Sequence, residues 1–276
     1  MKKNRKVRTG VLMASASLGL AMVALTGPAA QAAAPANDAW TDATAIAGLP
    51  FHAKGSTVEA TTDTVRPPGA YRADSHSMWW KITVPKDTRL YVATAPTTFN
   101  MRVGLYDAEN ATTTPDLWTQ VGHYVNWRDR AGMVRAIEGG ETYYLMVSSY
   151  GNNAGGDFQM VVRHPAKVGV TLAKTGFFDK VDGSAVFHGS VKSDRPTTVV
   201  RVSGYLRQLV GRHVTSGWGQ ANKKATATWS LWKVRVSTGS SFKAGAARLS
   251  HASARIFDNG VFVKRIQFPR TVITLK

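Results

Sequence analysis

The 276-residue chain contains no cysteine. This absence excludes disulfide bonds, thiolate nucleophiles and cysteine-ligated metals together. Domains of roughly 110–130 residues bury enough apolar surface to be stable without covalent links. We therefore expect the fold to be held together by packing alone.

Catalytic motifs are also lacking. The sequence has no G-x-S-x-G elbow, no H-E-x-x-H and no phosphate-binding P-loop, and its seven histidines are scattered. Asp38, Asp107, Asp116 and Asp157 could supply oxygen ligands for calcium, but no known spacing unites them, and solvated loop carboxylates are the alternative. We expect a non-catalytic protein without metal or cofactor. A hydrolase with an unfamiliar site remains an alternative.

Long apolar runs are absent except near the start of the chain. MKKNRKVR is followed by the apolar stretch GVLMASASLGLAMVAL and by Ala30-Gln31-Ala32, an A-x-A site. The apolar stretch is shorter than the roughly 20 residues that a membrane span requires, so an anchor is the weaker reading. The pattern predicts a signal peptide over residues 1–32 and a protein that is secreted, extracellular or attached to the cell surface, with no transmembrane segment after cleavage.

Acidic residues are scarce in the second half. Residues 33–164 hold 11 basic and 13 acidic residues, whereas residues 165–276 hold 19 basic and four acidic ones, a net charge of +15. Such asymmetry indicates two domains with different partners. Pro165 disfavours helix at His164, so we place the junction at 164–167 and the domains at 33–164 and 165–276.

The first half has the pattern of a β-sandwich. Short apolar segments recur at intervals of about 8–14 residues, are separated by Gly, Pro, Asn and Asp, and show no sustained helical period. The stretch NDAWTDATAIAGLP fits either a helical turn or an edge strand. The predicted strands are 78–84, 90–95, 101–106, 118–125, 132–137, 142–148 and 158–162.

Five segments of this half, in order, resemble a known family. NDAW, SMWWKITVP, FNMRVGLYDA, GGETYYLMVSSYG and GGDFQMVV together are similar to a bacterial pre-peptidase C-terminal domain over about residues 37–163. The resemblance implies a jelly-roll-like sandwich that accompanies secreted enzymes, is not catalytic itself and assists in binding a surface or substrate. The chain departs from the family in that no peptidase accompanies the module.

The second half shows strict alternation. In TTVVRVSGYLRQLVG, Val200, Val202 and Leu206 share one face, while Arg201, Tyr205 and Arg207 share the other. ATWSLWKVRVS repeats the pattern, with Lys233 and Arg235 on the polar side. Strands of this kind pack one face on a core and leave the other in solvent.

RIFDNGVFVKRI predicts a β-hairpin with a type I′ turn at Asn259-Gly260. A two-residue loop pairs Phe257 with Phe262, which supports the hairpin. It also pairs Arg255 with Lys264, and like charges directly across two strands are unfavourable. An anion bound between the two cations would remove this conflict.

The segment SGYLRQLVGR at 203–212, the later Trp232 and the final strand VITLK resemble the immunoglobulin-like domains of uncharacterised secreted actinobacterial proteins, over about residues 166–276. The resemblance implies an immunoglobulin-like sandwich and no assigned chemistry. Such domains often carry a cysteine pair, which this chain lacks. The overall prediction is an all-β protein of two β-sandwich domains, the first jelly-roll-like and the second immunoglobulin-like.

Basic residues beside an aromatic ring suit a phosphate-bearing polymer, because guanidinium groups fork phosphate oxygens. We therefore predict that the second domain holds an anionic cell-wall polymer, an anionic lipid surface or extracellular nucleic acid. A scatter of solvated charges is the alternative. A different function would be an accessory or inhibitor-like module that binds a secreted protein or enzyme through the first domain. The predicted polyanion-binding residues are Arg201, Tyr205, Arg207, Lys233, Arg235, Arg255 and Lys264.

Trp79 and Trp80 stand side by side in an alternating segment, so they point to opposite faces. Trp80 shares its face with Met78 and Ile82 and is the expected core residue. Trp79 shares its face with Lys81, which makes it a possible ligand contact, unless another segment covers it.

Overall fold

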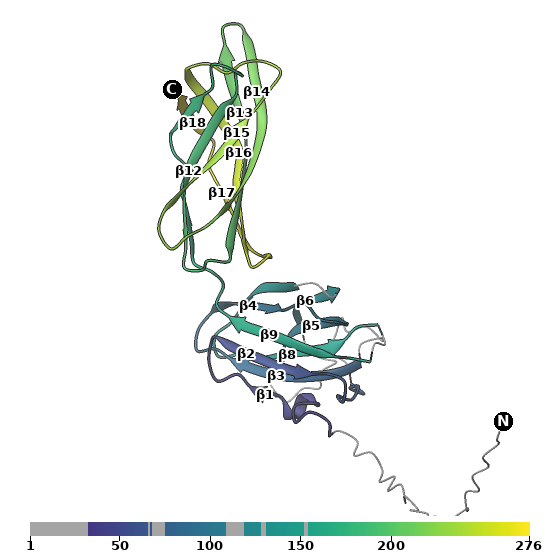
Figure 1. The fold of residues 1–276 in the computed structure, drawn as a ribbon. Helices are drawn as coiled ribbons and strands as arrows, with labels where there is room; N and C mark the ends of the chain where they lie inside the picture. The colour runs from purple at the N-terminus through teal and green to yellow at the C-terminus, as the bar shows by residue number, and fades with distance from the viewer. Residues whose placement is uncertain (1–32, 66, 68–74, 109–118, 128–130, 152–153) are drawn as a thin grey trace, which may run out of the picture. The chain divides into compact units, whose positions relative to one another are not determined.

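The computed structural model shows a chain built almost wholly of β-strands (Figure 1). It describes residues 33–65, 67, 75–108, 119–127, 131–151 and 154–276, so the expected signal peptide lies outside the described residues. Within these ranges the helical structure is one 3₁₀ turn, η1 (Trp40–Asp42), and none of it is long or apolar enough to cross a membrane. The all-β prediction is confirmed.

The strands that precede His164 form two sheets. In spatial order, one consists of β1 (Thr44–Ala45), β3 (Ser75–Thr83), β8 (Thr142–Ser149), β5 (Asn100–Asp107) and β6 (Thr119–Trp127). The other consists of β2 (Phe51–Ser56), β9 (Asp157–Arg163), β4 (Thr88–Thr94) and β7 (Ala131–Ile137). We call this pair of sheets the first sandwich. All seven strands expected from the alternating pattern are present, and β2 is an additional strand.

The core of the first sandwich is made by the inward residues of both sheets. Trp80 and Val103 come from one sheet, and Leu90, Phe158 and Val162 from the other. Trp80 is buried and meets Phe158 edge to face, with ring centroids 5.9 Å apart. The prediction that Trp80 is a core residue is confirmed.

The strands that follow Lys167 form a single continuous sheet. We call this sheet the second sandwich, because it folds into two layers. Its path is β10 (Val168–Val170), β12 (Ala185–Ser193), β11 (Thr175–Phe178), β18 (Thr271–Leu275), β16 (Gly245–Asp258), β13 (Thr198–Val210) and β14 (His213–Lys224), with β15 (Ser230–Val236) added beside β12 and β17 (Val261–Gln267) beside β16. The two layers bring β14 and β15 close together. A Cβ placed on Gly219 of β14 would meet the backbone of Arg235 in β15 at 2.5 Å.

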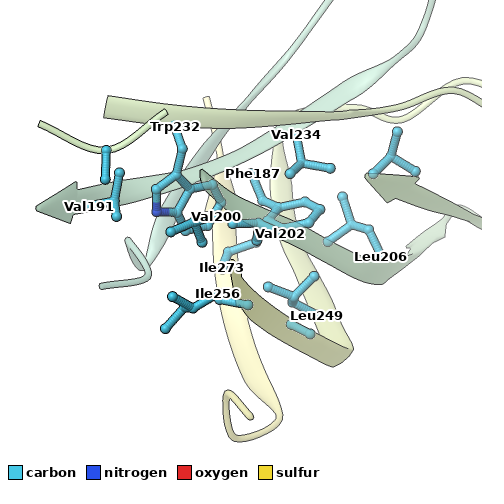
Figure 2. Close-up of a cluster of buried hydrophobic side chains, with 14 of the residues drawn as sticks. Phe187, Val191, Val200, Val202, Leu206, Trp232, Val234, Leu249, Ile256 and Ile273 are labelled. Carbon is cyan, nitrogen blue, oxygen red and sulfur yellow. The ribbon is translucent and has the colours of Figure 1, made fainter. Parts of the chain in front are cut away.

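Close packing replaces disulfides in this half. Figure 2 shows the buried cluster, in which Val200, Val202 and Leu206 of β13 lie among side chains of several other strands. Phe187 and Trp232 meet edge to face, with ring centroids 6.0 Å apart, and both are almost fully buried. The alternation predicted for β13 and β15 is confirmed by this burial.

The predicted hairpin is present, with one correction. Asn259 and Gly260 have φ angles of 52° and 86°, and Phe257 lies opposite Phe262 as expected. A β-bulge follows this pair, so the partner of Arg255 is Arg265 and not Lys264. The predicted pairing of Arg255 with Lys264 is therefore wrong, because the extra residue shifts the register by one.

Side chains of the two sandwiches contact each other within the compact unit formed by residues 33–276. The carboxylate of Asp258 is fully buried and pairs with Arg163, with 2.8 Å between Oδ2 and Nη2. The guanidinium of Arg163 also lies 3.7 Å from the centre of the Tyr91 ring. The Tyr91 hydroxyl donates a hydrogen bond to the backbone carbonyl of Asp258. The turn of the β16–β17 hairpin is thus held by residues of β4 and β9.

Candidate polyanion-binding face

The outer surface of β14, β13, β16 and β17 carries five arginines, and we call it the arginine face. Its members are Arg201, Arg207, Arg248, Arg255 and Arg265. The alternation of β13 positions Arg201 and Arg207 outward, because their neighbours Val202 and Leu206 are buried. Residues paired directly across neighbouring antiparallel strands lie on the same face, which places the other three arginines there too.

Three of these arginines form a line across three strands, the arginine row. Arg201 of β13 lies opposite Arg255 of β16, which in turn lies opposite Arg265 of β17. Cross-strand Cβ atoms are about 4.5–5.5 Å apart, and like charges at that separation repel. The row is therefore a costly arrangement for a free protein and a suitable one for an anion.

The other two arginines form the arginine pair, in which Arg207 lies opposite Arg248. Arg248 was not predicted, because it is seven residues from Arg255 and strict alternation would put the two on opposite faces. A register shift opposite Gly204, where His251 has a φ of 52°, adds one residue to β16. No pattern in the sequence signals this bulge, and it brings Arg248 and Arg255 onto one face.

The second sandwich has four acidic residues, and each is engaged away from the arginine face. Asp258 is buried against Arg163, and Asp194 accepts a hydrogen bond from the backbone N–H of Lys167. Asp179 and Asp182 both pair with Arg235. Among the described residues none of the five arginines of the face forms an ion pair. The face therefore presents cations without internal neutralisation.

Neighbouring side chains hold Arg201 in place. Its Nε donates a hydrogen bond to the side-chain carbonyl of Asn222 at 3.2 Å, and its guanidinium carbon lies 5.3 Å from the centre of the Phe257 ring. The terminal nitrogens of Arg201 make no hydrogen bond or ion pair with the described residues. An arginine fixed in this way loses less conformational entropy when it binds a ligand.

Aromatic rings lie between the arginine pair and the arginine row. Tyr205 follows Arg201 by four residues, and its hydroxyl donates to the Ser216 hydroxyl at 2.6 Å. Trp218 lies directly opposite Tyr205 and is 52% exposed. The sequence predicted Tyr205 on this face, but not Trp218.

Lys233 and Arg235 do not join the arginine face, although the prediction grouped them with it. They lie on β15, whose inward residues Trp232 and Val234 pack from the other layer of the sandwich. Arg235 is moreover paired with Asp179 and Asp182, at 3.2 and 2.6 Å. The prediction that groups Lys233 and Arg235 with the other residues is wrong for a physical reason. Alternation shows which residues of a strand point outward, but it does not show which layer of the sandwich the strand joins.

Lys264 is also displaced from its predicted place. The bulge in β17 puts it opposite Ile256, a buried residue, and Arg265 takes the outward position beside Arg255. Of the seven predicted residues, the arginine face contains four, which are Arg201, Tyr205, Arg207 and Arg255.

Trp79 offers no surface to a ligand, because it is fully buried. The face of β3 that carries it is covered by the segment around η1, and Trp79 packs with Ala43 and Tyr106. The indole Nε1 donates a hydrogen bond to the carboxylate of Asp63 at 3.0 Å. The prediction of a ligand contact at Trp79 is therefore corrected in favour of the alternative, a covering segment.

The proposed calcium ligands are not brought together. Across the described ranges there is no group of three or more His, Asp and Glu residues that could hold a metal ion. Asp38 accepts hydrogen bonds from the backbone N–H and the hydroxyl of Thr61. Asp116 lies outside the described residues.

The fold defines the chain as an all-β protein of sandwich type, and no narrower class is established. No family model matches the sequence, and no curated protein matches it. Among solved structures, the chain is similar to the pre-peptidase C-terminal domain of the Bacillus anthracis collagenase, with 17% identity, 44% of this chain and 94% of that chain covered, and a TM-score of 0.29.

Two further solved structures are similar to the chain. CorA, a surface-associated copper-binding protein of Methylomicrobium album BG8, has 9% identity, with 45% of this chain and 98% of that chain covered and a TM-score of 0.32. A β-glucuronidase from Ruminococcus gnavus also has 9% identity, with 74% of this chain but only 36% of that chain covered and a TM-score of 0.24. Likenesses at this level identify neither a ligand nor an activity.

Proposed function

We propose that this is a secreted, non-catalytic binding protein whose second sandwich attaches electrostatically to an anionic surface polymer or to nucleic acid. In this proposal residues 1–32 direct secretion, the first sandwich is a pre-peptidase C-terminal-like module, and the second is immunoglobulin-like. The observation that carries the proposal is the arginine face, with five guanidinium groups on one surface and all four carboxylates of that sandwich engaged elsewhere.

The arginine row is electrostatically unfavourable in the unliganded protein. Three arginines in register repel one another, and natural folds retain unfavourable surface arrangements of this kind mainly where function requires them. A polymer with many charges would neutralise several arginines at once and release its own counterions, so binding should weaken steeply as salt increases.

The test measures the binding of residues 33–276 to a fluorescent single-stranded oligonucleotide and to inorganic polyphosphate, from 50 to 500 mM salt. Engagement of all five arginines predicts a logarithmic slope of about −3.5 to −4.5. Arg255→Gln with Arg265→Gln should weaken binding more than tenfold at 50 mM salt. The control, Lys233→Gln with Arg235→Gln, removes the same charge from the opposite layer and should change binding less than threefold. Absence of binding to both polymers, or a flat salt dependence, would contradict the proposal.

A further inference from the structure

We propose that the ligand of the arginine face is single-stranded nucleic acid, with its phosphates on the arginine row and the arginine pair and a base stacked on Trp218. This inference rests on the proposed function and deepens it, because it chooses among the polyanions that electrostatics alone would admit.

Two aromatic rings lie between the two groups of arginines. Trp218 and Tyr205 lie opposite each other, between the Arg207–Arg248 pair and the row that begins at Arg201. A strand advances about 3.3 Å per residue, so Trp218 stands about 7 Å from the pair and about 13 Å from the row along the strand direction. A polymer that joins the two groups of cations along β13 therefore passes over Tyr205, with Trp218 beside it on the neighbouring strand β14.

Two aromatic rings of the face are about half exposed to solvent. Trp218 is 52% exposed on the face, and Phe262, which pairs with Phe257 beyond the arginine row, is 50% exposed. Exposed rings are of little use to a wall polymer made only of sugars, polyols and phosphates unless a sugar lies flat on them. Nucleobases stack on such rings, and each stacked base contributes about 1–3 kcal/mol.

The site is the outer surface of a sheet. The face is formed by paired strands, and its five arginines stand on three adjacent members of one sheet, β13, β16 and β17. A duplex keeps its bases stacked on one another and presents only their edges in the grooves, so exposed rings on a protein surface cannot stack on them. A single strand exposes both phosphates and bases to a surface of alternating cations and rings.

The geometry also sets the size of the site. The arginine pair and the arginine row are six residues apart on β13, which corresponds to about 20 Å. With the Phe257–Phe262 pair beyond the row, the face accommodates on the order of four nucleotides, which lies at the lower end of the range for single-strand-binding modules.

The experiment compares Trp218→Ala with the matched variant Trp229→Ala in residues 33–276. Trp229 is 49% exposed and lies against Lys192, outside the arginine face. The probes are a fluorescent oligothymidylate of eight nucleotides, a duplex of eight base pairs and inorganic polyphosphate. We expect Trp218→Ala to weaken oligothymidylate binding about tenfold and polyphosphate binding less than twofold, and Trp229→Ala to leave both unchanged. The duplex should bind at least tenfold more weakly than the single strand.

The outcomes separate the two proposals. Equal losses for oligothymidylate and polyphosphate in Trp218→Ala, or no loss for either, would overturn the stacked single strand and leave electrostatic polymer binding intact. Duplex binding as tight as single-strand binding would also overturn it. Circular dichroism spectra of the two tryptophan variants that match that of the parent protein would show that any loss is not due to unfolding.

Discussion

The carboxylate of Asp258 and the guanidinium of Arg163 form a buried ion pair, with 2.8 Å between Oδ2 and Nη2. The two residues are 95 positions apart in the sequence and belong to different sandwiches. Asp258 also accepts a hydrogen bond from the Thr197 hydroxyl, and it directly precedes the Asn259-Gly260 turn. The pair thus joins the hairpin that carries Arg255 and Arg265 to the first sandwich.

Removing this carboxylate should destabilise the protein strongly. Asp258→Asn leaves the Arg163 guanidinium buried without a counter-charge, which typically costs about 3–5 kcal/mol. Urea unfolding monitored by tryptophan fluorescence would measure the loss. Asp182→Asn, which breaks an exposed pair with Arg235, is the control and should lower the stability far less. Similar small losses for both variants would show that the buried pair contributes little.

The two neighbouring tryptophans should behave differently from ligand residues. Trp80→Ala removes a core ring and should lower the free energy of unfolding by about 3–5 kcal/mol. Trp79→Phe keeps most of the packing but deprives Asp63 of a hydrogen-bond donor. This change should lower the free energy of unfolding by about 1–3 kcal/mol. Polymer binding by the folded Trp79→Phe variant should equal that of the parent. A binding defect without a stability defect would mean that Trp79 contacts the ligand after all.

Stability should fall on acidification, and His188 should account for part of the fall. Burial lowers the pKa of His188 below its ordinary value of 6.5, and Lys233 adds to the shift. The unfolded chain therefore binds more protons than the folded one below about pH 6.5, so stability rises with pH through this window and levels off above it. His188→Gln should flatten the decline in unfolding free energy measured between pH 7.5 and 5.5. A decline as steep as that of the parent protein would rule out this role for His188.

The hairpin turn needs glycine at its second position. Gly260 has a φ of 86°, and a Cβ added there would have no atom within 4 Å, so Gly260→Ala would add backbone strain without a clash. The expected cost is about 1–2 kcal/mol, measured by thermal unfolding. Gly239→Ala has equal space and no positive φ, so it should be neutral or slightly stabilising. Equal effects of the two variants would show that the turn conformation is not required.

Neutralising the centre of the arginine row should make the protein more stable while it weakens binding. Arg255 lies between Arg201 and Arg265, so Arg255→Gln relieves two repulsions and should gain about 0.2–1 kcal/mol at low salt. The gain should disappear in 1 M salt, where exposed charges are screened. Chemical unfolding at both salt concentrations would measure it. A loss of stability at low salt would indicate that Arg255 has a structural partner instead.

Alternation and turn chemistry predicted much of the fold. The strands of the first sandwich follow from apolar segments between Gly, Pro, Asn and Asp, and the Phe257–Phe262 pair follows from the Asn-Gly turn. The candidate site was predicted only in part, because its composition depends on two bulges and on the layer that each strand joins. Long-range packing decides where a bulge forms, so the sequence did not assign Arg248 to the face and did not place Arg265 beside Arg255.

The sequence left the burial of Trp79 open, as the alternative to a ligand contact, for a similar reason. Its neighbours on β3, Lys81 and Thr83, are polar and indicate a solvated face. The covering residues come from the segment NDAWTDATAIAGLP, residues 37–50. This segment forms both the 3₁₀ turn and a short strand parallel to β3. Such a contact between distant segments leaves no periodic signal near Trp79.

Because of the bulge beside Phe257, the arginine row depends on the length of the β16–β17 hairpin as well as on its charge. Inserting one residue between Val263 and Lys264, with the single-residue bulge kept, would bring Lys264 opposite Arg255, while Arg265 would turn toward the interior. The number of basic residues would be unchanged, yet the row would lose its third guanidinium. Among homologues of this protein, a one-residue insertion in this hairpin would therefore distinguish chains that keep the site from chains that keep only the positive charge.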